Sequence, residues 1–207
     1  MIPEDDIARV VDAQTRFDAA IADLTDADVR RASTLPDWTV GHVLSHVARN
    51  ADSHRRRTEA ARRGEVVDQY PGGFEGRAAE IEAGAARPAA ELVADVRDSA
   101  ALMTDAWHAV PDDAWEHRTR DVGGRERPLR ELVGRRWQEV EVHLVDLAVG
   151  ITYRDWPDEF VAVWRPRLRA VFGDQVPAWT GLDDRDELAW LFGRLARPDL
   201  PVLAPWG

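Results

Sequence analysis

Glu139 and His143, two residues with metal-ligating side chains, stand four positions apart in an apolar-striped segment. On a helix this spacing puts both side chains on one face, with Cβ atoms about 5–6 Å apart, so one cation can bridge them. His46 lies beside Val43 and Val47 in a second striped segment, which favours an imidazole that faces the protein interior. Two imidazoles and one carboxylate leave a coordination position open, as in catalytic zinc sites. The pattern predicts a divalent metal, with zinc the first choice, held by His46, Glu139 and His143.

Two roles near the predicted site stay open: whether His42 is a metal ligand, and whether Asp146 binds an imidazole. His42 is also four positions from His46, so this pair could chelate a metal from one helix, and we rank that arrangement second. Asp146 follows His143 by three positions, and it could either accept a hydrogen bond from that imidazole or be a surface acid. The remaining histidines have no such partner and are expected at the surface or in packing: His54, His108 and His117.

The composition limits the possible cofactors and partners. The 207-residue chain has no cysteine, so it has no disulfide and no thiolate ligand, and a reactive thiol must come from outside. Its net charge of −11 repels a nucleic acid. The basic runs Arg55–Arg57 and Arg62–Arg63 are expected to be solvated near the end of a helix. Because the sequence shows neither a signal peptide nor an apolar run of about 18 residues, we expect a cytoplasmic protein without membrane contact.

Apolar residues at steps of three and four predict four long helices, which we expect to form an antiparallel bundle. The first spans residues 3–24, and the second starts after the N-cap Thr39 and ends before Gly64. The third ends near residue 109, with Pro88 in its first turn or at a break. The fourth starts at Pro128 and stops at Gly150. Residues 118–127 could form a hairpin or an irregular loop.

The last quarter of the chain is expected to be a short extension packed on the bundle. It contains helical patterns over 158–171 and 185–197, followed by a tail with three prolines over 198–207 that cannot form a long helix. The predicted fold class is mostly α, with α+β possible. The predicted domains are residues 1–150, the metal-binding four-helix bundle, and residues 151–207, the extension.

Two segments carry a family resemblance. Residues 35–52 (LPDWTVGHVLSHVARNAD) resemble the first signature of the mycothiol-dependent maleylpyruvate isomerases and their DinB-like relatives, and residues 136–147 (RWQEVEVHLVDL) resemble the second. The resemblance covers about residues 5–150 and implies a DinB-like four-helix bundle with a metal at one end. It also implies that His46, Glu139 and His143 hold the metal, and that mycothiol, a low-molecular-weight thiol, is the cofactor.

The resemblance further implies an activity. A metal-bound thiol loses its proton at neutral pH, and in the isomerase this thiolate adds to the double bond of maleylpyruvate, which then rotates and is released as the trans isomer. Residues 189–194 (AWLFGR) resemble the segment whose arginine faces the anionic substrate, so Arg194 is the expected catalytic arginine. We therefore expect an isomerase or a thiol S-transferase, monomeric or homodimeric, whose partners are a small thiol and an electrophile. The alternative is a non-catalytic, metal-binding regulatory protein, suggested by the short C-terminal part.

Overall fold

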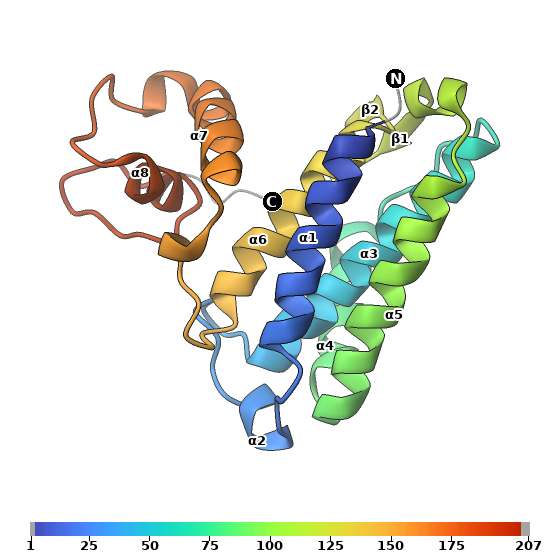
Figure 1. The fold of residues 1–207 in the computed structure, drawn as a ribbon, viewed down its shortest axis with the longest axis horizontal. Helices are drawn as coiled ribbons and strands as arrows, with labels where there is room; N and C mark the ends of the chain where they lie inside the picture. The colour runs from blue at the N-terminus through green and yellow to red at the C-terminus, as the bar shows by residue number, and fades with distance from the viewer. Residues whose placement is uncertain (1–2, 204–207) are drawn as a thin grey trace. The chain divides into compact units, whose positions relative to one another are not determined.

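The computed structural model describes residues 3–203, and the chain divides into two compact units, Met1–Ala148 and Val149–Gly207. Figure 1 shows the elements of each unit. The first unit contains α1 (Glu4–Ala20), α2 (Asp26–Val29), α3 (Val40–Arg62), α4 (Gly73–Ala85), α5 (Ala89–His108), η1 (Asp112–Glu116), β1 (Arg118–Arg120), β2 (Glu126–Pro128) and α6 (Glu131–Asp146). The second contains η2 (Tyr153–Asp155), α7 (Asp158–Phe172), η3 (Gly173–Gln175) and α8 (Asp184–Leu191).

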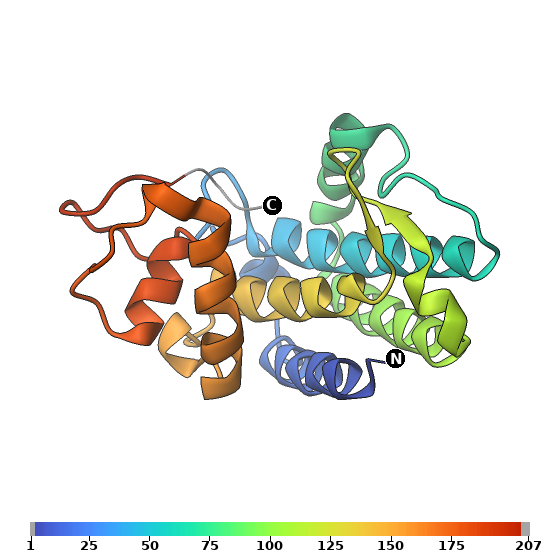
Figure 2. The same cartoon turned by 90° about the horizontal axis from the view of Figure 1, so that it is seen from above.

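Four long helices of the first unit, α1, α3, α5 and α6, form a bundle, and α4 packs on α3 (Figures 1 and 2). The interior contains the apolar stripes of these helices, for example Phe17 of α1, Leu44 of α3, Leu92 of α5 and Leu144 of α6, all buried. The predicted mostly α class and the four-helix bundle are confirmed, and the β structure is limited to one antiparallel hairpin in residues 3–203. No helix within this described range is long and apolar enough to span a bilayer.

A buried arginine ties three helices of the bundle together. Arg136 of α6 donates to the Val47 carbonyl and the Asn50 side chain of α3, at 2.9 Å each, and to Gln14 of α1 at 3.1 Å. Burial lowers the pKa of Arg136 to about 10, so the group stays charged at neutral pH. The contact fixes the spacing of α3 and α6, the two helices that carry the predicted metal ligands.

The start of α3 is as predicted. Thr39 Oγ1 accepts a hydrogen bond from the His42 backbone N–H at 3.3 Å, and His42 Nδ1 accepts one from the Thr39 backbone N–H at 3.1 Å. This reciprocal capping box satisfies two N–H groups that a helix start leaves free. The end is also close to prediction, since α3 stops at Arg62 and Gly64 has φ 74°.

The fourth helix is shorter than predicted at both ends. Pro128 is not its first residue but the last residue of β2, paired with Arg118, and α6 begins at Glu131. The helix ends at Asp146 rather than at Gly150, because Ala148 has φ 54° and leaves the helical region, and the Thr34 backbone N–H satisfies the free Asp146 carbonyl at 3.0 Å. The alternatives left open by the sequence are also resolved: residues 118–128 form a hairpin, and Pro88 is the N-cap at a break between α4 and α5.

Three further predictions need correction. Arg57 is only 3% exposed, so the Arg55–Arg57 run is not fully solvated. In the second unit α7 matches the predicted helix, but α8 stops at Leu191, because Gly193 with φ 70° ends the helical pattern before Arg197. The sequence analysis also missed α2, which begins with a capping box between Thr25 and Asp28. Residues 198–203 of the tail form neither helix nor strand, and 204–207 lie outside the described residues.

Candidate metal centre

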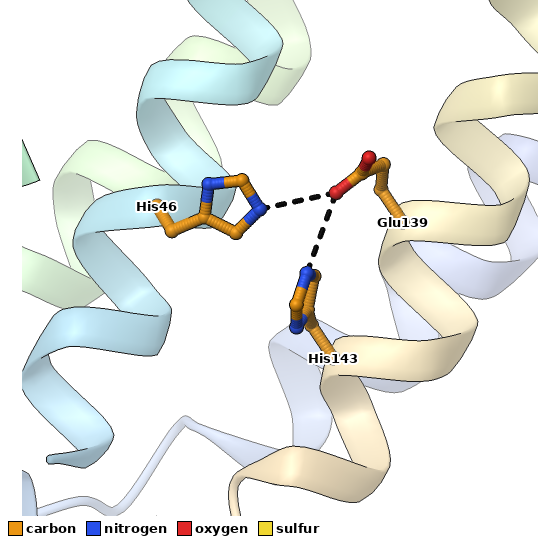
Figure 3. A group of neighbouring side chains, drawn as sticks. All are labelled: His46, Glu139 and His143. Atoms are coloured by element: carbon orange, nitrogen blue, oxygen red, sulfur yellow. Dashed lines mark hydrogen bonds and ion pairs between the residues drawn. The ribbon is translucent and has the colours of Figure 1, made fainter. Parts of the chain in front are cut away.

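Three side chains from α3 and α6 converge inside the bundle (Figure 3). His46 Nε2 lies 3.1 Å from Glu139 Oε2, and His143 Nε2 lies 3.4 Å from the same oxygen. One ligand atom from each residue lies within 4.8 Å of the others. The two imidazole rings stand nearly perpendicular, at 84°, with centroids 4.6 Å apart. The structure therefore brings together the three residues predicted as ligands, with two nitrogen atoms and one oxygen atom facing a common point.

The site is buried on one side and accessible on the other. His46 and His143 are buried, whereas the Glu139 side chain keeps 20% of its surface exposed. Trp38, just before α3, covers His46 with a ring edge at a centroid distance of 5.6 Å. A metal held here would be shielded by protein on the imidazole side while a ligand could approach beside the carboxylate.

Asp146 orients the second histidine. Its carboxylate is fully buried, binds His143 Nδ1 at 2.8 Å and accepts a hydrogen bond from Thr34 Oγ1 at 2.9 Å. An acceptor on Nδ1 keeps the proton on that nitrogen and leaves Nε2 free to ligate. Of the two roles considered for Asp146, the structure supports hydrogen bonding to the imidazole and excludes a surface acid.

The two histidines have opposite electrostatic surroundings. Burial lowers the pKa of His46 to about 4, because the imidazolium would lose its hydration. Burial acts in the same direction on His143, but hydrogen bonds with Asp146 and Glu139 outweigh it and raise the pKa of His143. Burial of Glu139 opposes its ionisation, yet hydrogen bonds from His143 and His46 hold its pKa well below the usual range. Glu139 is thus ionised, and His46 is neutral.

His42 does not join the group. Its Nδ1 binds Thr39 within the capping box and its Nε2 lies 3.1 Å from Glu82, so both ring nitrogens have partners away from the centre. The other histidines fit the predicted packing or surface roles: His54 is buried with its ring edge toward Trp107, His108 is exposed, and His117 binds the Ala61 carbonyl.

Arg194 belongs to the second unit, where it follows α8 and donates to the Phe192 carbonyl at 2.7 Å. Its expected role against the substrate stays a prediction. The sequence analysis missed Arg77 of α4, whose Nη2 lies 3.3 Å from His46 Nδ1. Neither spacing nor an apolar stripe marks Arg77, because the contact joins two helices that are distant in the sequence.

Comparison with known proteins gives a consistent result. The family model described as the mycothiol maleylpyruvate isomerase N-terminal domain matches residues 10–148. A crystal structure of the mycothiol-dependent maleylpyruvate isomerase aligns with a TM-score of 0.88 at 23% identity, over 98% of this chain and 96% of the other. A histidine-to-alanine mutant of a mycothiol-dependent maleylpyruvate isomerase aligns with a TM-score of 0.87 at 22% identity, over the same shares. Among curated proteins none matches this sequence.

Proposed function

The chain belongs to the mycothiol maleylpyruvate isomerase N-terminal domain family and is an isomerase-like enzyme, and we propose that its reaction depends on a divalent metal and a small thiol. The observation that carries the proposal is the convergence of His46, Glu139 and His143 within 4.8 Å. Three potential ligand atoms seldom face one point inside a helix bundle without a charge to hold, because burying polar groups costs free energy. A cation meets that requirement.

The donor set fits a divalent transition metal. Two imidazole nitrogens and one carboxylate oxygen are typical ligands of catalytic zinc, and nickel and iron accept them as well. We propose zinc, held by His46 Nε2, His143 Nε2 and Glu139 Oε2. Asp146 would fix the ring of His143, and the exposed edge of Glu139 would leave room for a further ligand.

Because the chain has no cysteine, a thiol nucleophile must come from a separate molecule. A divalent metal lowers the pKa of a thiol bound to it, so it supplies a thiolate nucleophile at neutral pH. The chain itself has no cysteine to provide one. In this family we propose mycothiol as the thiol, with cis–trans isomerisation of maleylpyruvate, or thiol transfer to a related electrophile, as the reaction.

The protein residues around the centre have distinct tasks in this proposal. Burial keeps His46 neutral and therefore able to ligate, and the same burial limits the access of water to the imidazoles. The bundle, residues 1–150, would hold the metal, and the extension, residues 151–207, would supply Arg194 to a carboxylate of the substrate. Arginine suits that task because its planar fork matches a carboxylate with two hydrogen bonds.

Metal analysis and turnover test the proposal. Purified protein should hold about one metal per chain, His46→Ala and His143→Ala should lose it, and His42→Ala, a histidine on the same helix but outside the group, should keep it. Maleylpyruvate turnover should require mycothiol and fail in the two metal-free variants. Retention of metal by both ligand variants would refute the site. A metal-loaded protein that is inactive with every thiol and electrophile tried would favour the non-catalytic alternative.

A further inference from the structure

His46 and His143 differ at the ring nitrogen that faces away from the centre. An imidazole that ligates through Nε2 carries its proton on Nδ1, and that N–H ordinarily donates to a carboxylate, a carbonyl or water. His143 has Asp146 in this position, but His46 Nδ1 has the Arg77 guanidinium at 3.3 Å. A guanidinium can only donate, so the Nδ1–H of a ligating His46 and the Arg77 guanidinium would be two neighbouring donors. Neither of them has a hydrogen-bond acceptor among residues 3–203.

Tyr70 adds a third donor without a partner. It is 2% exposed, and its ring lies 6.0 Å from Arg77 Cζ, which sits over the ring face. The Tyr70 hydroxyl is buried and has no hydrogen-bond partner in the part of the chain that the structure describes. Leaving such a hydroxyl unpaired is costly, so buried hydroxyl groups are normally hydrogen-bonded. A bound ligand with acceptor atoms would satisfy it.

Arg57 of α3 is a further buried arginine. It is 3% exposed and donates to two backbone carbonyls, those of Ser53 at 3.2 Å and Arg120 at 3.5 Å. Burial lowers the pKa of Arg57 to about 10, and Tyr70 and Asp121 act in the opposite direction. Among the other buried arginines described, Arg127 pairs with carboxylates and Arg136 binds neutral acceptors.

Arg135 extends the positive region onto α6. It stands one helical turn before Glu139 and forms neither a hydrogen bond nor an ion pair within the described residues. Two guanidinium groups therefore lie near the metal centre, Arg77 on α4 and Arg135 on α6. In a chain with a net charge of −11 this local excess of positive charge would attract an anion to one place.

We propose that Arg77 and the Tyr70 hydroxyl bind a carboxylate group of the substrate beside the metal centre. The inference rests on the proposed function and adds to it two residues of the first unit, Arg77 and Tyr70, that bind the substrate. A carboxylate would accept from Arg77, from Tyr70 and from the Nδ1 proton of His46, and so give all three donors the acceptor they lack.

Titration of maleate, a small dicarboxylate, into the zinc-loaded full chain tests this site by calorimetry. Arg77→Met should raise the maleate Kd about tenfold or more, as expected for a lost charge-assisted hydrogen bond, and Tyr70→Phe should raise it severalfold. Arg77→Lys keeps the charge and should recover part of the affinity. The matched control is Arg62→Met, because Arg62 is an exposed arginine near the end of α3, and its Kd should equal that of the wild type.

Metal content measured on the same samples separates the two proposals. A protein without metal contradicts the proposed function. If the wild type, Arg77→Met and Tyr70→Phe all hold metal and bind maleate with the same Kd, the carboxylate site alone is refuted. A metal-loaded wild type that fails to bind maleate at millimolar concentration would refute it as well. If Arg77→Met does not fold, Tyr70→Phe decides, because it removes only a hydroxyl that has no partner in the described structure.

Discussion

Replacing Asp146 by asparagine should weaken metal binding without touching a metal ligand. One oxygen of the Asp146 carboxylate accepts a hydrogen bond from His143 Nδ1 at 2.8 Å, and the other accepts one from Thr34 Oγ1 at 2.9 Å. Asparagine keeps the shape but has a single acceptor oxygen, so it can serve only one of these two donors. It also removes the negative charge that strengthens the imidazole as a ligand.

The expected size follows from the position of Asp146. Loss of a carboxylate that supports a ligating histidine costs roughly 10–100-fold in metal affinity, or about 1.4–2.7 kcal/mol. Because Asp146 is fully buried, solvent does not compensate for the missing charge. The pKa of His143, which the Asp146 hydrogen bond helps to raise, should fall in the metal-free variant, and this change can be followed by NMR titration of the imidazole.

Competition against a chromophoric zinc chelator would measure the affinity. The control is Glu82→Gln, which makes the same chemical change in an acid that binds His42 rather than a residue of the metal group, and its affinity should equal that of the wild type. A folded Asp146→Asn variant that binds zinc within twofold of the wild type would refute the reasoning. So would an equal loss in Glu82→Gln, since it would bring His42 into the site.

Three further predictions concern stability. Gly84→Ala should lower the free energy of unfolding by about 1–3 kcal/mol, because an added Cβ would lie 2.2 Å from Ser45 Oγ, whereas Gly123→Ala, with its nearest atom at 3.5 Å, should leave the thermal midpoint unchanged. Arg136→Met should cost about 3 kcal/mol in urea unfolding, because it leaves the side-chain oxygens of Asn50 and Gln14 without this donor, and a neutral effect would contradict this account. In the metal-free protein the pKa of His46 is about 4 in the folded state and about 6.5 in the unfolded state. Between these values the unfolded chain binds a proton at His46 that the folded chain does not, so this residue lowers the free energy of unfolding by up to about 3 kcal/mol as the pH falls from 6.5 to 4. Urea unfolding of the wild type and His46→Gln at pH 4 and 6.5 measures this effect. If the difference in the free energy of unfolding between the two proteins does not change with pH, the effect is excluded.

The predictable part of the centre depends on local geometry. Glu139 and His143 share a face because of the helical period alone, and the apolar neighbours of His46 are enough to turn it inward. Thr39 was identifiable as an N-cap for a similar reason, since a capping box involves residues only three positions apart. In each case the interaction that decides the structure lies within one helical turn.

The errors arise where distant segments compete with the local pattern. Pro128 has the right chemistry for a helix start, but pairing with Arg118 extends the strand through it. The pattern of the fourth helix continues to Gly150, yet Ala148 leaves the helical region at φ 54° and the Thr34 backbone N–H satisfies the free Asp146 carbonyl. Arg77 could not be assigned to the centre because its contact with His46 spans 31 residues and two helices.

The unequal surroundings of the two histidines determine how protons and metal exchange at this centre. Without metal, Asp146 and Glu139 favour the protonated form of His143, and its positive charge offsets the buried negative charge of Glu139. His46 stays neutral above a pH of about 4. Uptake of a cation therefore releases a proton from His143 and none from His46, so metal affinity should fall as the pH drops below the raised pKa of His143. The cation then stands near Arg77, and the two positive charges repel each other. A carboxylate bound by Arg77 would relieve that repulsion, so metal and an anionic substrate should each strengthen the binding of the other.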